Sequence, residues 1–427
     1  MTTPIIFVTL IFVYALLSKR VSETPITAPI MFTGAGMIMY SAWEHIAKAG
    51  MTPNIFLRLA EIGLVLLLFT DASRTDLKVL RNIGTLPGRL LTSGMLLTIL
   101  LGAILARLAF PNLSLWEAGI LATILAPTDA GLGQIVVNSP RVPTRVRQAL
   151  NVEAGLNDGL SVPFLLFFMA LAAAKIEGGA AGLLQFIEEQ LGLGVIVGVA
   201  IGLIGGWLLR IADRRGWVAE SSQQTAVVTL PLLCLLVAEM VDASMFIASF
   251  VAGLTIQIPF KEAAKHSVEF TEEWGQLLNL TVFFIFGMVL MRDWPQITLA
   301  SWIYAILSLT VIRMLPVAVS LIGTGLSRPT VFFMGWFGPR GLASIVLGLV
   351  YLEQELHLPG ESTIRLAVMA TVVLSIFSHG LSAMPGISIY ARKVAALESS
   401  APERQELGTK GWEECGAMPP PARDSSR

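Results

Sequence analysis

Long apolar runs, separated by short polar and charged connectors, make up most of the chain. An α-helix needs about 20 residues to cross the roughly 30 Å hydrocarbon core of a bilayer. About thirteen windows come close to that length, and they lie at 3–18, 25–43, 55–71, 88–110, 115–137, 148–174, 190–211, 223–241, 243–259, 276–291, 298–323, 331–352 and 363–384. The runs do not alternate polar and apolar residues as barrel strands do. The pattern therefore predicts an all-α polytopic membrane protein.

Composition agrees with this prediction. Residues of the hydrophobic types make up 54% of the chain and charged residues only 14%, whereas soluble domains are roughly 45–50% apolar. The charges gather in the connectors, so the net charge of −1 says little about partners. We expect the lipid bilayer of an inner or plasma membrane as a partner, and we expect no nucleic acid.

Basic residues concentrate in every second connector, and connectors of this kind lie on the cytoplasmic side. They contain Lys19 and Arg20, then Arg74, Lys78, Arg81 and Arg89, then Arg141, Arg145 and Arg147, then Arg210, Arg214 and Arg215, then Lys261 and Lys265. An odd number of helices then predicts an N-terminus outside and a C-terminus inside.

The chain divides into two predicted parts. Residues 1–390 form a transmembrane domain, and 391–427 form a disordered cytoplasmic tail, because the end of the chain is polar and Pro-rich. Within the first part, segment 262–274 reads as an amphipathic connector at the membrane interface.

Of the charged residues inside the apolar windows, four matter most, namely Asp129, Glu153, Asp158 and Arg313. Each costs at least about 2.5 kcal/mol there, which makes each a functional candidate. Asp129 and Asp158 lie about nine and ten residues from the cytoplasmic ends of consecutive windows, so both reach the midplane. Together they could bind a monovalent cation or share a proton. The alternative is that each satisfies a neighbouring helix end.

The positions of Glu153 and Asp158 on one helix predict different roles for the two residues. Glu153 shares a helix face with Asn157, whereas Asp158 points about 140° away. Glu153 needs a cationic partner, and the candidates are Arg313 and Arg340; we favour Arg313, which is deepest in its window. Asp158 then remains free to titrate.

Thr128 and Asn157 are the polar neighbours of the two aspartates in the sequence. Thr128 could offer its hydroxyl or its backbone carbonyl to a cation. Asn157 could orient either aspartate by a hydrogen bond. For both residues, local helix capping is the alternative.

Two windows carry helix breakers in their middle. Pro127 interrupts the fifth, and Gly338, Pro339 and Gly341 interrupt the twelfth. If the seventh window is a linker, these are the fifth helices of two six-helix halves. Broken helices at matching positions of two repeats indicate the midplane site of a transporter, whereas a proline kink without function is the alternative.

The motifs "APTDA" and "NVEAGLNDG", an intramembrane arginine before "GPRG" and a closing "SIFSHGLSA" follow in this order. In them the chain resembles the monovalent cation:proton antiporter superfamily, and within it the Asn-Asp branch of sodium:proton exchangers. The resemblance runs along most of residues 1–390.

The resemblance implies homodimers of thirteen-helix protomers, built from two inverted six-helix repeats with crossed discontinuous helices. It implies exchange of sodium or lithium for protons, electroneutral by analogy, with Asp158 as carrier. Asp129 and Thr128 would complete a transient cation site that Asn157 orders. Glu153 with Arg313, and Arg340, would hold the core.

Two departures affect the ion. Ala154 stands where a serine is common, and Ala130 where a proline is common. Potassium:proton exchange is therefore the main alternative, followed remotely by an ion channel or an intramembrane aspartyl protease. No phosphate-binding Gly-Lys-Ser/Thr loop occurs in the sequence, so we expect a transporter driven by ion gradients, neither an enzyme nor a cofactor protein.

Overall fold

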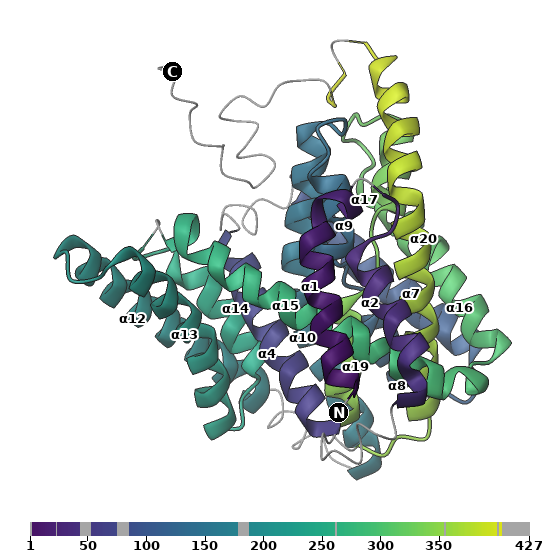
Figure 1. The fold of residues 1–427 in the computed structure, drawn as a ribbon. Helices are drawn as coiled ribbons and strands as arrows, with labels where there is room; N and C mark the ends of the chain where they lie inside the picture. The colour runs from purple at the N-terminus through teal and green to yellow at the C-terminus, as the bar shows by residue number, and fades with distance from the viewer. Residues whose placement is uncertain are drawn as a thin grey trace.

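The computed structural model describes residues 2–22, 24–42, 53–74, 85–177, 188–260, 263–353, 356–398 and 401–403, and in these ranges it contains helices and no strand (Figure 1). The helices of the first half are α1 (Thr2–Ser22), α2 (Ala28–Ile38), α4 (Pro53–Arg74), α6 (Leu86–Arg89), α7 (Met95–Ala109), α8 (Leu115–Ile124), α9 (Ala130–Val137) and α10 (Thr144–Glu177). They are followed by α12 (Gly194–Arg214) and then by those of the second half, which are α13 (Glu220–Met240), α14 (Met245–Ile256), α15 (Ala263–Asp293), α16 (Leu299–Leu309), α17 (Val311–Ser320), α18 (Arg328–Trp336), α19 (Leu342–Glu353) and α20 (Glu361–Ala395).

Each predicted window coincides with one helix or with consecutive helices separated by a short irregular stretch. Within the described ranges, seven helical stretches are long and apolar enough to cross a membrane by length and composition, and four shorter apolar helices accompany them. The all-α membrane fold is thus confirmed, while the number of thirteen crossings stays a prediction.

Two predicted boundaries differ from the structure. Residues 263–274 are not a separate connector, because α15 runs without a break from Ala263 to Asp293. No glycine or proline interrupts this segment before Gly275, so the helix continues. The last helix, α20, extends to Ala395, five residues into the predicted tail; from residue 404 the tail lies outside the described residues.

The two halves share an order of elements. Each half begins with three helices, followed by one further helical stretch, a broken helix and a long final helix. In the first half these are α1, α2 and α4, then α6 with α7, then α8 with α9, then α10. In the second half they are α13, α14 and α15, then α16 with α17, then α18 with α19, then α20. α12 stands between the halves, where the sequence predicted a linker. In space, α4, α12, α13, α14 and α15 pack together on one side, and α7, α8, α16, α17 and α20 on the other (Figure 1).

Glu117, on α8, joins the two halves on one side of the bundle. One oxygen of its buried carboxylate accepts the Ser114 N–H at 2.7 Å, which completes a capping box at the start of α8. The other accepts the Gly360 N–H at 2.6 Å, at the start of α20. A single side chain therefore satisfies backbone donors at the start of two helices that are distant in sequence.

α2 and α15 approach each other closely at two glycines. A Cβ on Gly36 would collide with the carbonyl oxygen of Phe284, and one on Gly287 would collide with the carbonyl oxygen of Thr33. Small residues at such crossings let helix backbones meet without a layer of side chains between them.

We expect Gly36→Ala to lower the free energy of unfolding by about 1–3 kcal/mol, because the added methyl forces the two backbones apart. The matched control is Gly34→Ala on the same helix, where a Cβ meets nothing within 4 Å. Thermal unfolding of the purified variants in detergent measures both. Equal unfolding temperatures for the two variants would contradict the close crossing.

Candidate functional site

Two irregular stretches cross at the centre of the candidate site. One, residues 125–129, separates α8 from α9; the other, residues 337–341, separates α18 from α19. Pro127 and Pro339 lie in these stretches, where a residue without an N–H interrupts the helical ladder. The structure thus has helix breaks at both predicted positions.

Asp129 ties the two breaks together. Its N–H donates to the carbonyl oxygen of Pro339 at 2.8 Å. Its Oδ1 accepts the Leu132 N–H at 3.0 Å in the first turn of α9, and its Oδ2 accepts the Leu342 N–H at 2.5 Å at the start of α19. One buried carboxylate therefore caps two half-helices, whose N-terminal dipoles favour a negative charge.

Arg340 connects the two breaks from the other side, because it lies in the second break and donates to carbonyl oxygens of the first. Its Nη1 donates to the carbonyl oxygens of Ala126 and Pro127 at 2.7 and 2.9 Å, just beyond the C-terminal end of α8. Its own N–H donates to Ser375 Oγ of α20 at 2.6 Å. The side chain is 0% exposed. A cation at a helix C-terminus and an anion at two helix N-termini thus neutralise the crossing.

Glu153 and Arg313 form a buried bidentate ion pair. The Nη1 and Nη2 atoms of Arg313, on α17, donate to the two carboxylate oxygens of Glu153, on α10, at 2.5 and 2.9 Å. Both side chains are less than 5% exposed. Gly338 leaves room for the guanidinium, since a Cβ at that position would collide with Arg313. The pair fixes α10 against α17 and leaves Glu153 without a free charge.

Asp158 differs from Asp129 and Glu153, whose carboxylate oxygens all accept hydrogen bonds. Its Oδ1 is buried and has no hydrogen-bond partner among the described residues. The charge of Asp129 lies close enough to act on it. Beside it in sequence, Asn157 donates through Nδ2 to Thr128 Oγ1 at 2.7 Å, and its own Oδ1 is also buried without a partner in the described ranges. Two acceptor oxygens are therefore unsatisfied next to the crossing.

Asp71 is a further carboxylate, to which the sequence analysis assigned no role. It lies on α4, and its Cβ is 3.2 Å from the position that a Cβ on Gly155 would occupy. Gly155 and Asp158 are three apart on α10 and share a face, and the charge of Asp71 also acts on Asp158. The signal in the sequence was an acidic residue at the end of an apolar window. The sequence alone does not show that this residue packs beside α10.

Ala154 faces a small cavity at the crossing. The cavity is lined by Thr128, Asp129, Ala130 and Ala154 together with Phe337 and Pro339 from the second break. The position that departs from the expected serine therefore lies beside the hydroxyl and carboxylate oxygens of Thr128 and Asp129.

His379 connects α20 to the end of α18. Its Nε2 lies 2.9 Å from the Trp336 carbonyl oxygen, and its Nδ1 lies 3.1 Å from Ser375 Oγ, the atom that accepts the Arg340 N–H. The Trp336 carbonyl oxygen can only accept, so Nε2 is the donor in that bond, and Nδ1 also lies 3.0 Å from the Ser375 carbonyl oxygen. His379 thus supports the backbone of the second break.

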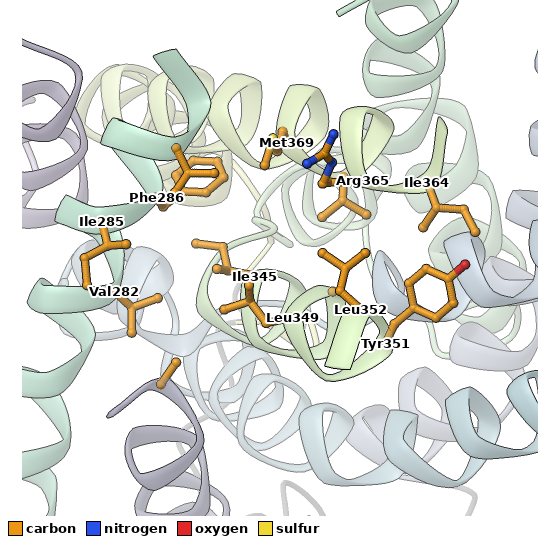
Figure 2. Close-up of a pocket in the computed structure, with 14 residues that line it drawn as sticks. Val282, Ile285, Phe286, Ile345, Leu349, Tyr351, Leu352, Ile364, Arg365 and Met369 are labelled. Carbon is orange, nitrogen blue, oxygen red and sulfur yellow. The ribbon is translucent and has the colours of Figure 1, made fainter. Parts of the chain in front are cut away.

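A separate apolar cavity of about 140 Å³ lies between α4, α15, α19 and α20 (Figure 2). Its lining has no carboxylate, and its one charged residue, Arg365, pairs with Asp293 at 3.2 Å. Among the described residues this cavity has no carboxylate to bind a cation, so the crossing, which has the Asp129 carboxylate and the Thr128 hydroxyl, is the better candidate site.

Comparison with known proteins agrees with this geometry. A family model described as "Sodium/hydrogen exchanger, transmembrane" matches residues 6–386. Na(+)/H(+) antiporter 2 of Zygosaccharomyces rouxii is 28% identical over 346 residues, which are 75% of this chain and 42% of that protein. Na(+)/H(+) antiporter NhaP of Pseudomonas aeruginosa is 27% identical over 354 residues, 76% of this chain and 79% of that protein.

Among solved structures, the sodium proton antiporter MjNhaP1 from Methanocaldococcus jannaschii superposes with a TM-score of 0.71 and 20% identity. The match covers 89% of this chain and all of that one, so the two share a fold. This likeness and the family match, which spans most of the chain, show that the chain is an integral membrane protein of the sodium/hydrogen exchanger family.

Proposed function

We propose that the protein is a secondary active antiporter that exchanges sodium or lithium for protons at the crossed helix breaks. One observation carries the proposal: Asp158 has an unsatisfied carboxylate oxygen beside Asp129 and Asp71, while the oxygens of Asp129 and Glu153 already accept hydrogen bonds. Family membership and the relatives described as Na(+)/H(+) antiporters support it.

The proposed mechanism is competition at Asp158. A monovalent cation or a proton can neutralise this carboxylate, and each excludes the other. Glu153 is not a competitor, because Arg313 holds both of its oxygens. Both oxygens of Asp129 already accept N–H groups, so Asp129 would act through its remaining lone pairs and its charge.

Further oxygen ligands are available around Asp158. Thr128, whose hydroxyl accepts from Asn157, has a lone pair left for a hard cation, and Asn157 Oδ1 is unsatisfied. Asp71 would add a third carboxylate from the opposite group of helices. A bound cation would therefore have contacts on both groups, which couples occupancy to their relative movement.

The wider arrangement follows from this mechanism. We propose that the group containing α8, α10, α18 and α19 moves against the group containing α4 and α14, with two copies associating in an inner or plasma membrane. The N-terminus would lie outside and the C-terminus in the cytoplasm, and no bound cofactor would be required. Potassium is the second candidate ion, because Ala154 supplies no hydroxyl to the cavity that it lines.

Asp158→Asn should abolish cation-dependent proton movement in proteoliposomes, because an amide cannot exchange a proton for a cation. The assay follows internal pH after addition of sodium, lithium and potassium in turn. Asp213→Asn, an exposed acid on α12, is the control and should transport normally. Exchange retained by Asp158→Asn would overturn the proposed carrier, and flux without proton coupling would indicate a channel.

Asp71→Asn should keep exchange but raise the half-saturating sodium concentration at least about tenfold, since tenfold corresponds to about 1.4 kcal/mol and a nearby carboxylate contributes that much or more to cation binding at an effective dielectric constant of about 20. The same proteoliposome assay, run as a sodium titration, measures this. An unchanged sodium requirement would remove Asp71 from the site without affecting the role of Asp158.

Ala154→Ser should lower the half-saturating sodium concentration relative to potassium, because it adds a hard oxygen ligand to the cavity beside Thr128. Ala154→Cys is the matched control, since it adds similar bulk with a soft sulfur. A similar shift in both variants would show that side-chain volume and not oxygen ligation sets ion preference.

A further inference from the structure

A second feature lies away from the crossing, on the outer face of the bundle. A groove of about 580 Å³ runs between α17 and α18, with Val311, Leu315 and Ala318 on one wall and Val331 and Phe332 on the other. Phe332 is 65% exposed and Leu315 is 52% exposed. In a chain embedded in a bilayer, an open apolar face of this kind meets lipid.

The length of the groove matches one leaflet. From Ala318 back to Thr310, the residue before α17, the wall spans eight residue steps, or about 12 Å at helical rise. Half of a roughly 30 Å hydrocarbon core is about 15 Å. The groove therefore has the depth of an acyl chain that starts at one membrane surface and ends near the midplane.

Arg328 gives the groove a charged end. It lies in the first turn of α18, lines the groove and is exposed, and within the described ranges its side chain has no hydrogen bond or ion pair. Arg89 adds a second positive charge at this end of α17, where its Nη1 donates to the Ile322 carbonyl oxygen at 2.7 Å.

The acidic residue at this end of α18 is Glu403, and its Oε1 already accepts hydrogen bonds from α18 and the residue before it. Its Oε1 accepts the Ser327 N–H at 2.6 Å and the Thr330 hydroxyl at 2.8 Å, and the residue is 3% exposed. These hydrogen bonds outweigh the effect of burial and hold the pKa of Glu403 below its usual range. With two arginines and one glutamate, the net charge at the mouth is positive.

The geometry points to a binding site for one anionic phospholipid, with an acyl chain between α17 and α18 and its headgroup phosphate on Arg328. An unengaged guanidinium favours a phosphate oxygen pair, and basic pockets between membrane helices bind anionic headgroups. The apolar walls accept the chain, and a zwitterionic lipid would lack the net charge that the mouth selects.

The location links this site to the crossing. α17 carries Arg313 on its buried side, and α18 leads into the break that contains Gly338 and Arg340. A lipid in the groove contacts the outer faces of both helices, so it would hold α17 against α18.

Native mass spectrometry of the purified full-length protein tests the assignment, with phosphatidylglycerol and phosphatidylcholine of identical acyl chains as probes. We expect the wild-type chain to retain phosphatidylglycerol more strongly. Arg328→Gln should weaken its binding about fivefold, the contribution of one arginine near an anionic surface. Ala318→Leu, which fills the groove, should weaken the binding of both lipids.

Matched controls separate this site from general lipid coating. Arg214→Gln removes an exposed arginine at the end of α12, and Ala200→Leu enlarges an exposed alanine on the same helix. Neither should change lipid retention. The assignment fails if Arg328→Gln and Arg214→Gln lower phosphatidylglycerol binding equally, if neither groove variant has an effect, or if the wild type retains both lipids alike.

Discussion

The requirement that backbone polar groups be satisfied inside a membrane governs the centre of this protein. Two helices end and restart in the apolar core, which leaves free N–H groups at two half-helix starts and free carbonyls at an end. Asp129 accepts from both starts and Arg340 donates to the end. Without these two side chains the breaks would carry several unsatisfied backbone groups in hydrocarbon, each costing several kcal/mol.

This neutralisation also defines which charge is available for chemistry. At the crossing, the Asp129 carboxylate and the Arg340 guanidinium neutralise the helix ends. The Glu153 carboxylate and the Arg313 guanidinium neutralise each other. Of Asp129, Glu153 and Asp158, only Asp158 has a buried oxygen without a hydrogen-bond partner among the described residues, and it lies on a helix that the Glu153 pair holds in place. The fixed charges thus support the architecture, and the proposed transport chemistry depends on the residue that they leave unneutralised.

Much of this arrangement could be read from sequence, because its signals are local. Apolar length predicted the helices, and Pro127 and Pro339 predicted the breaks. The depth of Arg313 favoured its pairing with Glu153, and the two are in contact. The double cap by Asp129 was not predictable, since its second donor belongs to Leu342. Asp71 was missed for the same reason: its proximity to Gly155 depends on the packing of α4 against α10.

The bond between Asp129 and Leu342 has a consequence for how the chain is made. The two residues are 213 positions apart, so at about 5–20 residues per second the second donor is synthesised roughly 10–40 s after the first break. During that interval the Asp129 carboxylate has only half of its partners. The first half of the chain must therefore wait in the membrane with its centre unfinished until the second half arrives to close it.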